Sequence, residues 1–148
     1  MAAKAIDACL DNGKFAKSQV AFIAAGTTQS DLPVPGFASM VHGASKLPVC
    51  DITSHQSVCS AGIMALKSAF LHVQAGEHEN AISCAADMPS RMFKASRFDK
   101  QAHIQKKGLP LDTDFLRWML SDGAGAIYLS EQANSNGISF EIEWIEVK

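Results

Sequence analysis

Apolar residues along this chain alternate between helical spacing and short, nearly continuous runs. Apolar residues three or four positions apart predict helices at residues 2–10, 37–46 and 63–75. Continuous runs predict buried strands at 20–25, 47–53 and 81–86, and apolar–polar alternation predicts a last strand at 138–147. Because helices alternate with buried strands, the pattern predicts an α/β fold with helices packed on a mainly parallel sheet.

Other stretches predict turns and irregular structure. Residues 31–36 contain two prolines and a glycine and are predicted to form a loop. Gly76 is predicted to end the helix before it, since glycine readily adopts the left-handed conformation found there. Residues 89–116 are rich in charged and amide side chains and predict neither helix nor strand. No repeat or linker divides the chain, so residues 1–148 are expected to form a single domain.

Composition excludes several classes of function. With 47% hydrophobic and 19% charged residues, the 148-residue chain suits a globular protein with a sizeable core. A formal net charge of −2 argues against nucleic acid as a main partner, although the basic residues of segment 91–107 leave room for an acidic ligand. No signal peptide and no apolar run of membrane-spanning length is recognised, so a cytoplasmic protein without membrane contact is expected.

The four cysteines, at positions 9, 50, 59 and 84, lack the spacing of a zinc site, and no metal is expected. Cys50 and Cys84 lie in apolar runs and are expected to be reduced, buried thiols. Cys59 differs, because it lies between a predicted strand and a predicted helix. Unpaired N–H groups and the positive end of the dipole at a helix start favour a thiolate, so Cys59 is a candidate nucleophile. The alternative is a buried structural cysteine.

Two further features bear on this candidate site. His55 precedes Cys59 and is either a base for the thiol or a loop histidine hydrogen-bonded to the backbone. Asp122 opens a glycine–alanine segment, residues 122–126, in which small side chains allow a close backbone approach. Asp122 is expected to tether this turn by accepting backbone hydrogen bonds. A phosphate-binding loop is disfavoured, since the segment leads into a strand instead of a helix.

Four segments of the sequence resemble the thiolase-like condensing enzymes, closest to β-ketoacyl-acyl-carrier-protein synthase III. They occur in the same order as in that family: 19–28, 58–62 (VCSAG), 80–87 and 121–126 (SDGAGA). The resemblance implies one half of an αβαβα architecture, the N-terminal half, truncated at both ends relative to the family. It also implies that Cys59 is the acyl-accepting nucleophile. The family's partner His and Asn lie in the other half and match no position here. Residues 53–57 make a longer connection to the nucleophile than the family turn.

The resemblance further implies an acyltransferase of fatty acid or polyketide biosynthesis that forms a cysteine acyl-enzyme and condenses thioesters with loss of carbon dioxide. Its partners would be acyl-coenzyme A and acyl carrier protein, and coenzyme A or phosphopantetheine thioesters would be substrates, with no cofactor. A homodimer is implied, paired through the strand at residues 80–86. The implied site residues are Val34, Phe37 and Arg117 for substrate, and Gly123 and Gly125 for an oxyanion-binding turn.

Three possibilities stay open. The chain is either part of such an enzyme or a non-catalytic fragment, a dimerisation or scaffold half without turnover of its own. A third possibility is an unrelated cysteine hydrolase, which would need a histidine and an orienting group within the chain, and only His55 offers itself.

Overall fold

The computed structural model describes residues 1–94, 96, 98, 111–135 and 137–147. They form two compact units, Met1–Ala86 with Ala124–Lys148, and Asp87–Gly123. The larger unit is built from α1 (Ala2–Gly13), the short 3-10 helix η1 (Lys17–Gln19), β1 (Phe22–Thr27), α2 (Phe37–Ser45), β2 (Asp51–Gln56), α3 (Ala61–Gln74), β3 (Asn80–Asp87) and β4 (Gly123–Ser130). The smaller unit holds the 3-10 helix η2 (Pro89–Arg91) and α5 (Leu111–Met119).

The four strands form one sheet in the order β2-β1-β3-β4. Strand β1 pairs in parallel with β2, Phe22 lying opposite Asp51, and in parallel with β3, Ile23 lying opposite Ile82. The predicted α/β fold with a mainly parallel sheet is therefore confirmed. Both edges of β3 are occupied, by β1 and β4, so residues 80–86 cannot pair with a second copy as expected. The strands at the edges are β2 and β4.

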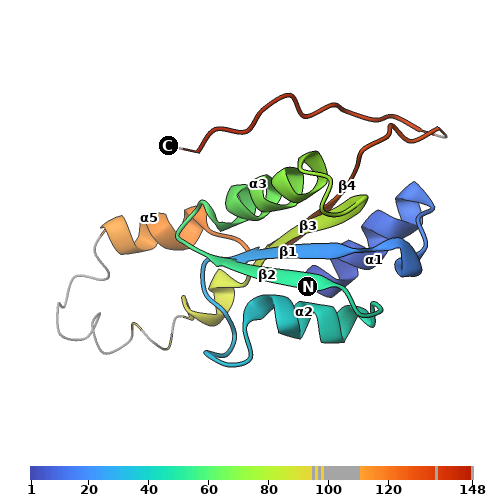
Figure 1. Cartoon of the computed structure of the whole chain (residues 1–148). Coiled ribbons are helices and arrows are strands. Elements are labelled where there is room, and N and C mark those ends of the chain that lie inside the picture. Colours follow the sequence, from blue (N-terminus) through green and yellow to red (C-terminus); the bar gives the residue numbers. More distant parts are fainter. Residues whose placement is uncertain (95, 97, 99–110, 136, 148) are drawn as a thin grey trace. The chain divides into compact units, whose positions relative to one another are not determined.

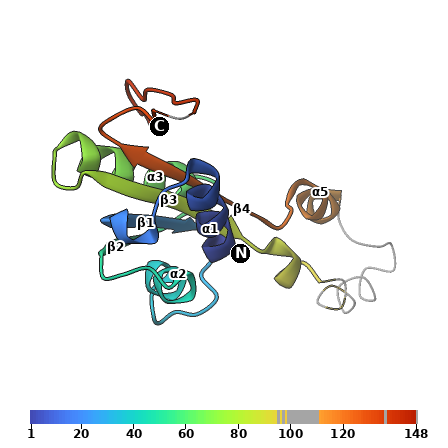
Figure 2. The same ribbon diagram turned by 90° about the vertical axis from the view of Figure 1, so that its right-hand side faces the viewer.

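Helices cover both faces of this sheet (Figures 1 and 2). On one face, α1 and α2 pack against Ile23 and Ala25 of β1. On the other, α3 packs against Phe22 and Ala24. All six residues of β1 are buried, because successive side chains enter opposite cores. This two-sided burial is why β1 has a continuous apolar sequence.

The helices follow the predicted spacing, with one change of face. Helix α1 buries Ile6 and Leu10 on the sheet and ends where Lys14 adopts a left-handed conformation, with φ of 57°. Gly76 follows α3 with φ of 70°, as predicted. In α2 the spacing of Val41 and Ala44 predicts both on the core face, but Ala44 is exposed and Ser45 is buried instead. Burial of Ser45 costs little, because its hydroxyl donates to the carbonyl of Val41 at 2.8 Å.

Strand β2 begins later than predicted. It runs over Asp51–Gln56 instead of residues 47–53, and Val49 before it is 99% exposed. As an edge strand it is only half-buried, so its second half is polar and the pattern does not predict those residues as strand. Most of segment 53–57, which looked like a long connection, therefore belongs to the strand. The remaining turn before α3 is short.

The strand predicted at residues 138–147 is absent. Residues 138–147 form no strand, although their apolar and polar residues alternate, and they are not part of the sheet β2-β1-β3-β4. Ile138, Phe140 and Trp144 are 87%, 90% and 71% exposed, and Ile142 alone of this set packs against the core beneath α3. We call residues 131–147 the C-terminal arm, which runs outside the sheet (Figure 1).

Helix α5 (Leu111–Met119) lies partly within a stretch expected to be irregular. Asp112 and Asp114 occupy its first turn, where carboxylates interact favourably with the helix dipole. Among the described residues, no helix has the length and apolar character needed to cross a bilayer.

Candidate active site

Cys59 lies in a tight turn between the carboxyl end of β2 and the start of α3. The N–H of Ser60 donates to the carbonyl of Val58 at 2.9 Å, which closes a three-residue turn around Cys59. Cys59 itself has φ of 63°, a left-handed conformation that costs a non-glycine residue roughly 1–3 kcal/mol. The residue is exposed to solvent. A strained, exposed thiol at a strand–helix junction is typical of a positioned nucleophile.

Hydrogen bonds of Ser60 connect the turn to the start of α3. The hydroxyls of Ser57 and Ser60 are hydrogen-bonded to each other at 2.8 Å. The first helical hydrogen bond of α3 runs from the N–H of Met64 to the carbonyl of Ser60 at 3.0 Å. No side chain caps this end of the helix. Cys59 therefore precedes the helix by two residues instead of lying in its first turn, next to N–H groups that no side chain caps.

Gly26 of β1 fixes where α3 begins. A Cβ atom at Gly26 would lie 2.4 Å from the carbonyl oxygen of Ala61 and 2.7 Å from its carbonyl carbon. At the next residue of α3, a Cβ on Gly62 would contact the Cβ of Ala85 in β3 at 3.3 Å. The start of α3 thus lies directly on the carboxyl ends of β1 and β3. This is the edge of a parallel sheet at which ligands usually bind.

A hollow of about 530 Å³ opens at the carboxyl ends of β1 and β2. Its polar lining residues are Thr27, Gln29, Ser30, Asp31, Ser54, His55 and Gln56. Of the two predicted acyl-pocket residues, Phe37 lines this hollow and Val34 does not. Val34 is 80% exposed in the loop before α2.

Hydrogen bonds hold part of this lining in place. The Oγ of Ser54 accepts the N–H of Ala38 at 2.9 Å, which anchors the first turn of α2. His55 lies in β2, not in a loop as expected, and its Nε2 is 3.2 Å from the Oγ1 of Thr53. Burial lowers the pKa of His55, which favours the neutral form of its ring. The Oγ of Ser30 is buried and has no hydrogen-bond partner.

The other three cysteines are unsuited to act as nucleophiles. All four cysteines are unpaired; Cys84 is buried as expected, whereas Cys50 is only half-buried. Burial raises the pKa of Cys9 and of Cys50, and it raises the pKa of Cys84 to about 12. Cys59 is the exposed member of the set. Within the described part of the chain, no group of three or more His, Cys, Asp or Glu residues is placed to hold a metal ion.

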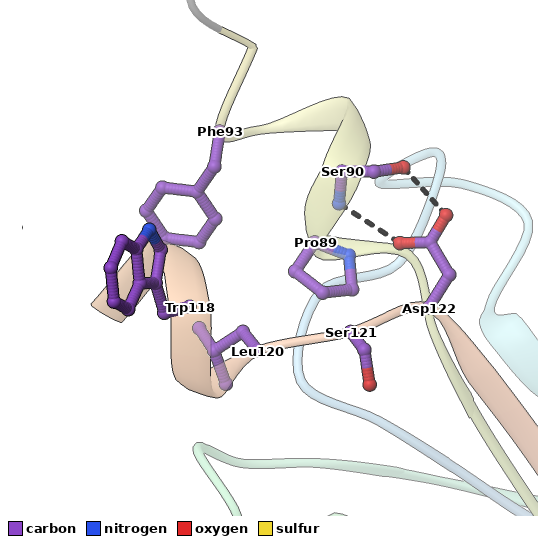
Figure 3. A pocket seen from close by; sticks show the side chains of 7 residues that line it. All are labelled: Pro89, Ser90, Phe93, Trp118, Leu120, Ser121 and Asp122. Atoms are coloured by element: carbon purple, nitrogen blue, oxygen red, sulfur yellow. Dashed lines mark hydrogen bonds between the residues drawn. The ribbon is translucent and has the colours of Figure 1, made fainter. Parts of the chain in front are cut away.

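The smaller unit has a hollow of its own, of about 520 Å³, beside Asp122 (Figure 3). Asp122 accepts the N–H of Ser90 at 2.9 Å and its hydroxyl at 2.5 Å, which confirms the predicted tether. The side-chain hydrogen bond from Ser90, and then the backbone one, lower the pKa of Asp122. Phe93 and Trp118 line the same hollow.

The remaining predicted site residues are placed as follows. Gly123 and Gly125 lie within β4, so the segment predicted to be a glycine-rich turn is the first half of a strand. Arg117 lies on α5, and its side chain is outside the described part of the structure. The basic segment 91–107 is described at 91–94, 96 and 98 only.

Sequence reasoning missed Ser30, Ser54 and Gln56 as lining residues of the hollow. The sequence pattern predicts a connection at Ser54 and Gln56, because it places strand β2 too early. A usable signal was present at Ser30, since polar residues that directly follow a buried parallel strand lie at the ligand-binding edge of the sheet.

No protein-family model and no curated protein matches this sequence. The fold does match solved structures. AbyA1, a tetronic acid condensing enzyme, matches with a TM-score of 0.74 and 23% identity over 91% of this chain and 38% of its own. The β-ketoacyl-[acyl carrier protein] synthase III FabH of Thermus thermophilus matches with a TM-score of 0.65 and 21% identity, over 90% and 36%. A variant of OleA from Xanthomonas campestris matches with a TM-score of 0.74 and 16% identity, over 87% and 38%.

These matches confirm the fold that the sequence resemblance implied. The chain has the fold of one half of the thiolase-like condensing enzymes, and it spans 36–38% of the length of these three structures.

Proposed function

We propose that this chain is the nucleophile-bearing half of a condensing enzyme of the β-ketoacyl-acyl-carrier-protein synthase III kind. The observation that carries the proposal is the turn at Cys59, which presents an exposed thiol in a left-handed conformation at the carboxyl edge of the sheet. Its place in the fold, two residues before α3, whose start lies on the carboxyl ends of β1 and β3, supports the proposal. The likeness to AbyA1 and FabH supports it further.

In the proposed reaction, the sulfur of Cys59 attacks the carbonyl carbon of an acyl thioester. The new C–S bond forms first and gives a tetrahedral intermediate; the bond to the carrier thiol then breaks, and the released thiolate takes up the proton that Cys59 gives up. N–H groups of the first turn of α3 stabilise the negative oxygen of the intermediate, because no side chain caps them. Coenzyme A or the phosphopantetheine of an acyl carrier protein is the proposed carrier. Condensation with a decarboxylating thioester would then need residues beyond this half.

The fragment hypothesis makes a different prediction, since a dimerisation or scaffold half needs no acyl-enzyme. We expect the isolated chain to accept an acyl group from acyl-coenzyme A on Cys59, slowly, and to release no carbon dioxide from a malonyl thioester. Positioned acid–base and electrostatic groups contribute about 10²-fold each, and the second step lacks those of the other half. Intact mass and peptide mapping follow the first step, and labelled carbon dioxide follows the second. Absence of acyl-Cys59 contradicts the proposed function, and release of carbon dioxide contradicts the division between halves.

We also propose that this chain pairs with another copy of itself through the edge strand β2. One backbone edge of strand β2 (Asp51–Gln56) is hydrogen-bonded to β1. Its other edge has no partner strand in the described sheet, and such edges pair readily with a strand of another chain. We expect a dimer at tens of micromolar, about the range of a transient association. Sedimentation measures the mass, and hydrogen exchange should show concentration-dependent protection at β2 but not at β4. A monomer, or protection at β4 instead, contradicts this pairing.

A further inference from the structure

Four residues, 57–60, connect the end of β2 at Gln56 to the start of α3 at Ala61. The two in the middle of this connection are exposed: Val58 to 77%, and Cys59 beside it. Packing therefore contributes little to holding either side chain. The position of the thiol depends instead on the hydrogen bonds that close the connection around it.

One of these hydrogen bonds lies in the backbone and one joins two side chains. The backbone bond runs from the N–H of Ser60 to the carbonyl of Val58 at 2.9 Å. The side-chain bond joins the Oγ atoms of Ser57 and Ser60 at 2.8 Å, and both residues are half-buried. Ser57 is the first residue of the connection and Ser60 is the last. The bond between them therefore spans the whole connection, including Cys59.

Cys59 needs such a constraint, because its own conformation is unfavourable. Its φ of 63° lies in the left-handed region, which a non-glycine residue keeps only where the surrounding structure imposes it. The start of α3 is fixed on the other side, since Ala61 lies directly on Gly26 of β1. A relaxation of Cys59 to negative φ would therefore turn the sulfur relative to a helix start that stays in place.

The bond between the serines also bears on the N–H groups of α3. Ser60 is the N-cap residue of this helix, a position at which a serine hydroxyl commonly accepts an N–H of the first turn. Here the hydroxyl is hydrogen-bonded to Ser57 and caps no N–H group. In the proposed reaction, these uncapped N–H groups stabilise the negative oxygen. One hydrogen bond thus acts on both the sulfur and its oxyanion donors.

We infer that Ser57 is a positioning residue for acyl transfer, because its hydroxyl, through Ser60, holds the sulfur of Cys59 next to the uncapped N–H groups of α3. This inference rests on the proposed function, in which Cys59 takes the acyl group. Ser57 acts on the direction of the sulfur and takes no part in the bond changes. Its loss should slow a reaction that needs an oriented sulfur, and spare one that needs only an exposed thiolate.

The test compares two reactions of Cys59 in the unmodified chain and in Ser57→Ala. Acetyl-coenzyme A transfers its acetyl group to the sulfur and releases coenzyme A, and its carbonyl oxygen must reach the N–H groups as the sulfur attacks. Iodoacetamide alkylates the sulfur with release of iodide and needs no oxyanion donor. In Ser57→Ala we expect acylation to be about tenfold slower and alkylation to stay within about twofold. Intact mass follows both rates.

Three further variants examine whether the hydrogen bond is the cause. Ser57→Thr keeps a hydroxyl and should restore most of the acylation rate. Ser60→Ala should lose as much as Ser57→Ala, and the double variant should lose no more than either, because both substitutions remove the same bond. Ser130→Ala is the matched control, since its hydroxyl donates to the carbonyl of Gln132 at 2.7 Å at the end of β4. Its acylation rate should equal that of the unmodified chain.

The outcomes that overturn the inference are an unchanged acylation rate in Ser57→Ala, equal slowing of acylation and alkylation, and additive losses in the double variant. Equal slowing would mean that the substitution disturbs the fold or the exposure of the thiol. Circular dichroism checks that each variant is folded.

A measurement on Cys59 itself separates this inference from the proposed function. Should the unmodified chain accept no acetyl group, the proposed function fails, and NMR still reports the conformation of Cys59. A positive φ brings the amide proton and the Hα of a residue close together, which gives a strong cross-peak between them. We expect a strong cross-peak at Cys59 in the unmodified chain and in Ser57→Thr, and a weak one in Ser57→Ala. A weak cross-peak in the unmodified chain, or a strong one in Ser57→Ala, overturns the inference.

Discussion

Replacing Cys59 by alanine is expected to remove nearly all labelling of the folded chain by limiting iodoacetamide. The remaining thiols are half-buried or buried, and burial raises the pKa of each. A thiol with a pKa of about 12, as at Cys84, has about a thousandfold less reactive thiolate at neutral pH than one with the ordinary value near 9. Peptide mapping of the unmodified chain and of Cys59→Ala measures the loss.

Cys84→Ser is the control for this experiment. Because Cys84 is buried in β3, its replacement should leave the labelling of the native chain unchanged as long as the fold is intact. Circular dichroism of both variants shows whether the fold is kept. Preferential modification of Cys50 or Cys84 in the folded protein would count against Cys59 as the nucleophile.

Gly26→Ala is expected to destabilise the chain by roughly 3 kcal/mol, at the upper end of what overpacking costs. The added Cβ would lie 2.4 Å from the backbone oxygen of Ala61, and neither the central strand β1 nor the start of α3 can move away cheaply. For a domain of this size, such a loss corresponds to a fall in Tm of roughly 10 °C. Urea unfolding followed by circular dichroism measures the free energy.

The matched substitution Gly43→Ala should have the opposite sign. Gly43 lies inside α2, is exposed, and a Cβ there would have no neighbour within 4 Å. Alanine is a better helix former than glycine, so the free energy of unfolding should rise by about 0.5–1 kcal/mol. If both variants lost stability equally, the contact between β1 and α3 would not be the cause of the effect at Gly26.

The sequence predicted best those elements whose side chains are buried on both sides or at helical spacing. Strand β1 is predicted correctly because it is buried on both faces and therefore has a continuous apolar sequence. Helix α3 is predicted correctly because the residues that it buries recur at helical spacing. Strand β2 was misplaced because an edge strand needs less apolar sequence. The prediction of a strand in the C-terminal arm is wrong. Alternation indicates that a segment could have one apolar and one polar face, but it does not indicate whether another strand lies beside it.

The candidate site was predictable in part for a similar reason. Local sequence located Cys59 between a strand and a helix, and it identified Asp122 as a tether. The left-handed conformation of Cys59 and the close approach of Ala61 to Gly26 depend on contacts between segments far apart in the sequence. The polar lining at Ser30 likewise becomes visible only where β1 and β2 end together.

The two tryptophans of this protein are both at its surface, which has an optical consequence. Trp118 and Trp144 are 88% and 71% exposed, so their indole rings are already in contact with water in the folded state. Intrinsic fluorescence should therefore change little in wavelength when the chain unfolds, and it is a poor probe of stability. The same exposure makes Trp144 a built-in reporter on the C-terminal arm. Whatever comes to cover that arm should shift its emission to the blue, without any added dye.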